Sequence, residues 1–268
     1  MKPFLEHRRD GAVVVLTMNR PETLNAVSDP DAIAALIEAC ARINADHGVA
    51  AVVLTGSGSA FSSGGNLKTI RDSVGAGLGA PVLSRHAYRD GIQRVPLALY
   101  GLEVPTIAAV NGHALGAGND LACMCDIRIA SEQARFASTF IKLGLLPGDG
   151  GAWLLPRTVS RTRAYEMAFT GRTIDAAQAL TWGLVSQVVP ADELMGAAMA
   201  LAQEIARHSP QALRLTKRLM REAEHSRLDT ILEMSAGFQA LAHHTPEHEQ
   251  ALAAFLSRST QTTKRGQA

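Results

Sequence analysis

Hydrophobic positions along the chain follow two different periods. Short runs rich in β-branched residues predict buried strands at 12–18, 50–55, 106–110 and 127–130. Apolar residues that recur every three or four positions predict helices at 30–45, 116–124 and 175–182. Because strands and helices alternate, the pattern is typical of a layered α/β core.

The last third of the chain has a different pattern. No strand signal remains after residue 192, and successive helices are predicted at 192–208, 210–225 and 228–243. The chain is therefore expected to form an α/β core at 1–191, which carries the site, and an all-helical region at 192–268. The apolar positions of this helical region exceed what one small layer can bury, so we expect a homo-oligomer.

Composition argues against several classes of protein. With 26 basic and 25 acidic residues, the net charge of +1 gives no field that would attract nucleic acid or an anionic membrane. No apolar run has the length of a signal peptide or a membrane span. The cysteines, Cys40, Cys123 and Cys125, lie in apolar segments without the spacing of a disulfide framework or a zinc site. We expect a cytoplasmic protein that holds no metal.

Two turns rich in small residues follow predicted strands. The first ends in Gly64–Gly65, and the second passes Gly112 and Gly116 into a helix that begins near Ala117. Glycine lets backbone amides face a ligand, and the first amides of a helix are free donors. Two such turns can converge on one oxygen and stabilise charge on a carbonyl, although close packing explains each turn equally well. The glycine motifs of dinucleotide-binding proteins, P-loop proteins and serine hydrolases are absent from the sequence.

Three longer segments carry a resemblance to a known family. They read LTGSGSAFSSGGNLK at 54–68, PTIAAVNGHALGAGNDLA at 105–122 and GLLPGDGGAWLLPR at 144–157. Together with shorter matches in the second half, they resemble the enoyl-CoA hydratase/isomerase family, or crotonase superfamily, over nearly the whole chain. The resemblance implies a spiral of ββα repeats in two sheets, followed by helices that mediate trimerisation, often as a dimer of trimers.

The same resemblance implies a substrate and its contacts. The substrate would be an acyl-CoA thioester of fatty-acid or related metabolism, with coenzyme A as part of the substrate and no other cofactor. The oxyanion amides would be those of Gly65 and Ala117. Contacts to the substrate would come from Leu24, Asn25, Ala26, Ser63, Gly64, Gly65, Asn66, Leu67, Gly116 and Phe140, with Phe255 and Arg258 reaching the ligand of a neighbouring subunit.

The catalytic carboxylates depart from the hydratase pattern. Hydratases of this family usually carry two glutamates, and the corresponding positions hold Asp120 and Phe140. Phenylalanine cannot orient or deprotonate water. Asp149 is the compensating candidate, unless it is only the N-cap of a following helix, and Asp120 could instead stabilise a helix dipole. Double-bond isomerisation, which one base can perform, therefore competes with hydration, and thioester or β-diketone hydrolysis is a third option.

A non-catalytic role is the alternative from another class. Arg214, Lys217, Arg218 and Arg221 have the spacing of one helix face, which would suit acyl-CoA or RNA binding, but a solvated face explains them better in a chain of balanced charge. Pro246 lies between His244 and His248, and no third ligand is near in sequence, so metal binding there is not expected.

Overall fold

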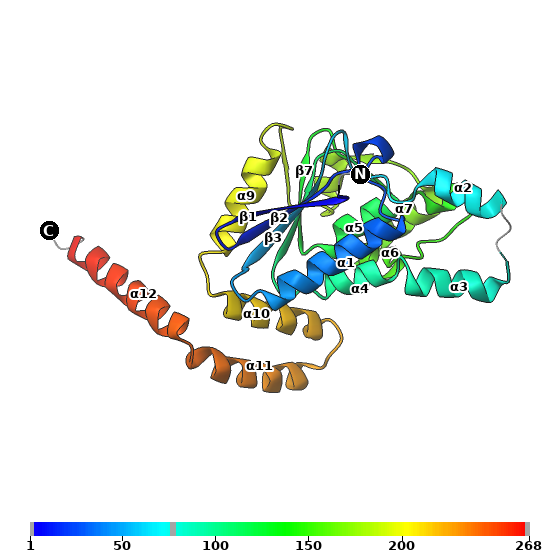
Figure 1. Ribbon diagram of the computed structural model, residues 1–268. Helices are drawn as coiled ribbons and strands as arrows, with labels where there is room; N and C mark the ends of the chain where they lie inside the picture. The colour runs from blue at the N-terminus through cyan, green and yellow to red at the C-terminus, as the bar shows by residue number, and fades with distance from the viewer. Residues whose placement is uncertain (1–2, 76–78, 266–268) are drawn as a thin grey trace. The chain divides into compact units, whose positions relative to one another are not determined.

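The computed structural model describes residues 3–75 and 79–265, and for 73–75 and 258–265 it describes the backbone alone. The chain forms two compact units, Met1–Ala206 and Arg207–Ala268. Figure 1 shows the strands of the first unit between helices. None of the helices in the described part is long and apolar enough to cross a membrane.

Two sheets organise the first unit. The larger sheet has the strand order β1-β2-β3-β5-β7-β10, and all neighbours except β1 and β2 are parallel. Its strands are β1 Leu5–Asp10, β2 Val13–Met18, β3 Ala51–Gly56, β5 Thr106–Val110, β7 Ile127–Ser131 and β10 Gln187–Val189. The smaller sheet has the order β4-β6-β8-β9 and consists of β4 Ala60–Ser62, β6 His113–Leu115, β8 Arg135–Ala137 and β9 Ile174–Asp175.

Three successive strand pairs connect the two sheets. In β3 and β4, in β5 and β6, and in β7 and β8, the first strand joins the larger sheet and the second joins the smaller one. The pairs are followed by the helices α2 Leu67–Gly75, α5 Ala117–Met124 and α6 Gly151–Thr158. This arrangement is the spiral of ββα repeats that the sequence resemblance implied. The strands of the smaller sheet have only two or three residues, which is too short for a period to be recognised in the sequence.

The remaining helices of the first unit cover the sheets or connect the repeats. They are η1 Pro21–Thr23, α1 Pro30–Ala45, α3 Pro81–Asp90, α4 Arg94–Tyr100, η2 Thr139–Leu143, α7 Arg161–Thr170, α8 Ala176–Thr181 and α9 Leu194–Ile205. The helices predicted at 30–45, 116–124 and 175–182 correspond to α1, α5 and α8.

Alternate residues of the larger sheet belong to two separate cores. On β2, Val13 and Val15 pack with α9, whereas Val14 and Leu16 pack with residues from α1 and α5. All four side chains are at most 7% exposed. Because successive side chains of a strand point to opposite faces, a sheet covered on both faces needs apolar residues at every position. This explains why the predicted strands are continuous hydrophobic runs.

The boundary between the α/β core and the C-terminal helical region lies at a higher residue number than the sequence suggested. Helix α9 was expected in the C-terminal region of 192–268, but it belongs to the first unit and packs on β3, β5 and β7. Its buried residues Leu194, Ala198 and Ala202 recur every four positions and cover one face of the sheet. The second unit contains α10 Pro210–Ala223, α11 Leu228–His243 and α12 Pro246–Arg265, the last of which the sequence analysis did not predict.

Candidate active site

The loop between β2 and α1 holds the Gly64–Gly65 turn from one side. The Ser63 amide donates to the Leu24 carbonyl at 2.8 Å, and the Val27 amide donates to the Gly64 carbonyl at 2.8 Å. These two bonds run between segments that are distant in sequence. They fix the turn against the loop that the resemblance assigned to coenzyme A binding.

Within this turn, the Gly65 amide differs from its neighbours. The Gly64 amide donates to Ser62 Oγ at 3.0 Å, and the Asn66 amide donates to Ser28 Oγ at 2.9 Å. In the described part of the chain, no acceptor receives a hydrogen bond from the Gly65 amide. This N–H group is therefore available to a ligand.

Asn25 holds the loop in an unusual conformation. Both Leu24 and Asn25 have a positive φ, of 52° and 54°. The buried Asn25 side chain accepts from the Arg20 amide at 2.9 Å and donates to the carbonyls of Ser57 at 2.9 Å and Ala60 at 2.8 Å. Asn25 and Ala26 are fully buried, so Leu24 is the residue of the predicted coenzyme A segment whose side chain reaches the surface.

The second turn meets the first directly. Helix α5 begins at Ala117, after Gly116 at a φ of 53°, and its first helical bond runs from the Asp120 amide to the Gly116 carbonyl. Among the residues that the structure describes, the Ala117 amide has no acceptor. A Cβ placed on Gly64 would lie 2.6 Å from the Ala117 nitrogen. The fold therefore brings together the two amide sources that lie far apart in the sequence.

Asp120 and Asp149 form a buried pair of carboxyl groups. Asp120 lies in the first turn of α5 and is fully buried, and Asp149 precedes α6 and is 4% exposed. The N-cap of α6 is Gly150, so Asp149 does not cap this helix. Asp120 Oδ2 and Asp149 Oδ1 are buried and receive no hydrogen bond from any other group in the described residues. A proton shared between the two carboxyls would supply the donor that these oxygens lack among the described residues.

Burial raises the pKa of both carboxyl groups, and repulsion by Asp149 raises the pKa of Asp120 further. The hydrogen bond between them raises the pKa of Asp120 and lowers that of Asp149. The pKa of Asp120 is raised the more strongly of the two, and the two carboxyls titrate as a coupled pair.

Gly151, which the sequence analysis did not single out as a site residue, leaves room for Asp120. The Asp120 carboxyl lies against the first residue of α6, and a Cβ on Gly151 would overlap it. The Gly151 backbone amide beside this carboxyl opposes the rise of the Asp120 pKa. The adjacent glycines at 150 and 151 indicate that another group packs closely against the backbone there, but the sequence did not indicate that this group is the Asp120 carboxyl.

Phe140 lies beside the second turn. It is half-buried in η2, and its ring is 3.8 Å from the position that a Cβ on Gly116 would take. The phenyl ring therefore borders the start of α5 and offers no hydrogen-bonding group there. His113 lies on β6 with an exposed side chain, and Leu67 is exposed at the start of α2.

The remaining predicted residues belong to the second unit. Phe255 is an exposed residue of α12, and the Arg258 side chain lies outside the described part of the chain. In α10, Arg214 and Lys217 are buried, so the expectation of a wholly solvated basic face on this helix is wrong. The exposed His243 and the half-buried His248 approach each other, with 3.2 Å between Nδ1 and Nε2. In the described chain, no group of three or more His, Cys, Asp or Glu residues is arranged to hold a metal ion.

A ββα spiral with two adjoining amide turns and a buried pair of carboxyls defines an α/β protein of the crotonase fold. The family model for enoyl-CoA hydratase/isomerase matches residues 8–264. A Mycobacterium bovis protein named probable enoyl-CoA hydratase is 37% identical over 262 residues, which cover 96% of each chain. The 1,2-epoxyphenylacetyl-CoA isomerase of Escherichia coli is 37% identical over 265 residues, 98% of this chain and 99% of that protein.

Solved structures agree with the sequence relatives. An enoyl-CoA hydratase from Bacillus anthracis superimposes with a TM-score of 0.88 at 33% identity, covering 95% of this chain and 96% of that one. The chain therefore belongs to the enoyl-CoA hydratase/isomerase family, and it is an acyl-CoA enzyme of the crotonase superfamily. The resemblance noted in the sequence is confirmed.

Proposed function

We propose that this enzyme shifts the double bond of an enoyl-CoA by moving one proton, with the charge held by the Gly65 and Ala117 amides. The observation that carries the proposal is the buried pair of Asp120 and Asp149, whose unpartnered oxygens and raised pKa values favour one proton shared by two carboxyl groups. Such a pair offers a base and an acid at the same pH.

The reaction from a 3-enoyl-CoA to a 2-enoyl-CoA balances with these groups alone. The ionised Asp149 takes a proton from C2, and the negative charge moves to the thioester oxygen, where the two free amides stabilise it. Asp120 then gives its proton to C4, and the double bond forms between C2 and C3. The proton on Asp149 returns to Asp120 and restores the pair. Coenzyme A enters as part of the substrate, and this chemistry needs no metal or redox cofactor.

Phe140 favours isomerisation over hydration. Addition of water needs a group that orients and deprotonates a water molecule, and an apolar ring beside Gly116 supplies none. Proton transfer within the substrate needs no bound water, and the ring would help to exclude water from the enolate.

Hydration is the second candidate function. Two carboxyl groups are present at the site, and proteins named enoyl-CoA hydratases are among the relatives. If the Asp149 carboxylate reaches a water molecule, the same pair could deprotonate this water and protonate C2.

A parallel assay tests the choice between these functions. We expect wild-type protein to convert a 3-enoyl-CoA to its 2-enoyl isomer, without change of mass, faster than it adds water to crotonyl-CoA. Asp149→Asn should remove most of the isomerase activity, and Phe140→Glu should raise hydration, because a positioned acid or base contributes roughly 10²–10⁴-fold. Efficient hydration by wild-type protein with no isomerisation would overturn the proposal.

We also propose a homotrimer or a hexamer in the cytoplasm. Large apolar side chains are exposed on α11 and α12, among them Leu228, Leu232, Leu241, Leu252 and Phe255. Exposed apolar residues in such number are typical of a subunit interface. Analytical ultracentrifugation at micromolar concentration would detect the assembly, and a monomer would contradict it.

A further inference from the structure

Asp29 stands at the N-cap of α1 but does not cap this helix. Aspartate is a preferred N-cap residue because its side chain accepts hydrogen bonds from the first helical amides. The Asp29 side chain makes no such bond, and only its backbone carbonyl accepts from the Ile33 amide, at 3.0 Å. The Asp29 carboxylate therefore points away from the first amides of α1 and forgoes the hydrogen bonds of an N-cap.

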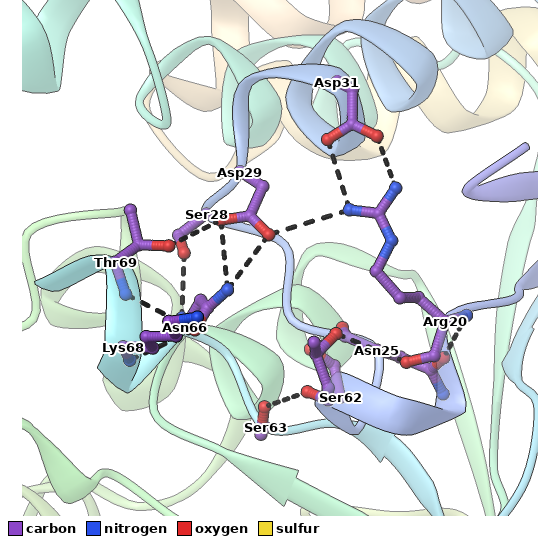
Figure 2. A network of polar contacts seen from close by, with 11 residues as sticks. Arg20, Asn25, Ser28, Asp29, Asp31, Ser62, Ser63, Asn66, Lys68 and Thr69 are labelled. Atoms are coloured by element: carbon purple, nitrogen blue, oxygen red, sulfur yellow. Dashed lines mark hydrogen bonds and ion pairs between the residues drawn. The ribbon is translucent and has the colours of Figure 1, made fainter. Parts of the chain in front are cut away.

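The Asp29 carboxylate instead binds the start of α2. It accepts from Asn66 Nδ2 at 3.2 Å and from Thr69 Oγ1 at 3.2 Å. The Arg20 guanidinium lies 3.6 Å away on another side, and these two charged side chains are only 17% and 15% exposed. Figure 2 shows Asp29 between these three partners, of which Asn66 and Thr69 lie at the start of α2 and Arg20 in the segment after β2.

Arg20 is itself fixed in place. Its guanidinium also pairs with Asp31, and it lies over the Phe4 ring at 5.2 Å from the ring centroid. Because the Arg20 guanidinium is already held on several sides, its side chain loses little further conformational entropy when it orients the Asp29 carboxylate. The Asp29 carboxylate thus lies between Arg20 on one side and Asn66 on the other.

Asn66 connects Asp29 to the proposed oxyanion donor. It directly follows Gly65, its amide donates to Ser28 Oγ, and its Oδ1 accepts from the Lys68 amide at 3.1 Å. Asp29 binds the Nδ2 end of the same side chain. The residue after Gly65 is therefore fixed at its backbone and at both ends of its side chain.

We propose that Asp29 is a positioning residue, which aims the Gly65 amide by holding Asn66 and Thr69 at the start of α2. This role rests on the proposed function, since it concerns the oxyanion donor of that site. Donors of this kind must lie within a few tenths of an ångström of the developing charge, and a small displacement lowers turnover more than binding.

Asp29→Ser is the informative variant. Serine also suits an N-cap, so α1 should still form, but its side chain is too short to reach Asn66. Glu38→Gln is the matched control, because Glu38 is an exposed carboxylate of the same helix that pairs with Arg42 and has no bond to Arg20 or α2 among the described residues. Asp29→Asn, whose amide oxygen can still accept from Asn66 and Thr69, should recover part of the activity. Thermal melts followed by circular dichroism establish that each variant is folded.

Two readouts distinguish positioning from a general loss of structure. The first compares the change in kcat for isomerisation with the change in the Kd of butyryl-CoA, a saturated analogue that does not react. The second is the ¹³C shift of [1-¹³C]butyryl-CoA, because donors that polarise the carbonyl move this signal downfield. For Asp29→Ser we expect kcat to fall about 10-fold, with a change in Kd of less than about threefold and a reduced downfield shift. Glu38→Gln should match the wild type in all three quantities.

The outcomes separate the two proposals. If wild-type protein causes no downfield shift, the oxyanion proposal fails and the positioning role fails with it. If the wild type shows the shift and folded Asp29→Ser keeps both the shift and kcat, only the positioning role is overturned. A loss of kcat with an unchanged carbonyl shift, or an equal loss in Glu38→Gln, would also overturn it.

Discussion

The carboxyl groups of Asp120 and Asp149 meet in the interior, where burial raises the pKa of both. One residue belongs to α5 and the other to the loop before α6, two elements that pack together. Two ionised carboxylates at such a place would repel each other strongly, so the pair retains a proton under conditions in which exposed aspartates are ionised.

The pH dependence of catalysis should reflect this pair. We expect a bell-shaped profile of kcat/KM, because activity needs Asp149 ionised and Asp120 protonated. The acid limb should lie above the ordinary range of an aspartate, and the alkaline limb higher still, because the pKa of Asp120 is raised further. Rates measured from about pH 4 to 10 would test this. A plateau down to the ordinary aspartate range would contradict the assignment.

Stability should depend on pH through the same residue. The folded-state pKa of Asp120 lies above its unfolded value, so its favourable contribution is complete below about pH 4 and is lost as the pH rises through the folded pKa. Asp120→Asn is neutral at every pH. We expect this variant to gain in Tm relative to wild type as the pH rises, although it should lose activity. A difference in Tm that is constant with pH would argue against a buried titrating group.

Gly151→Ala should disturb catalysis without unfolding the protein. The added Cβ would overlap the Asp120 carboxyl and displace it, and a displacement of about 1 Å can cost roughly 10²-fold in rate. Gly196→Ala in α9 is the control, since a Cβ there meets no atom within 4 Å. The control should keep full activity and gain about 0.5–1 kcal/mol in unfolding free energy. Equal kcat in the two variants would contradict the role of Gly151.

Ala117→Pro removes one proposed oxyanion donor. Ala117 is the first residue of α5, where proline is well tolerated, so the helix should still form. We expect kcat to fall by about 10²–10³-fold, whereas Ala117→Gly, which keeps the N–H group, should retain most of the activity. Circular dichroism is the check on folding. Similar turnover by the folded proline and glycine variants would exclude this amide from the site.

The sequence by itself determined the α/β core, the family and the candidate residues of the site. Strands covered on both faces are continuous hydrophobic runs, and helices repeat every three to four residues, so both kinds of element are local signals. The ordered motifs at 54–68, 105–122 and 144–157 carried the family resemblance. They also named Gly65, Ala117 and Asp120 as site residues.

Only the tertiary structure decided which of these groups meet. The contact of Gly64 with the Ala117 amide and the pairing of Asp120 with Asp149 join segments that are remote in sequence, and burial of the pair follows from the packing of α5 on α6. The same is true of Asp29, a residue type that suits the N-cap position it occupies before α1. Its contacts with Asn66 and Thr69 exist because the fold places the start of α2 beside it, and no local pattern encodes that neighbour.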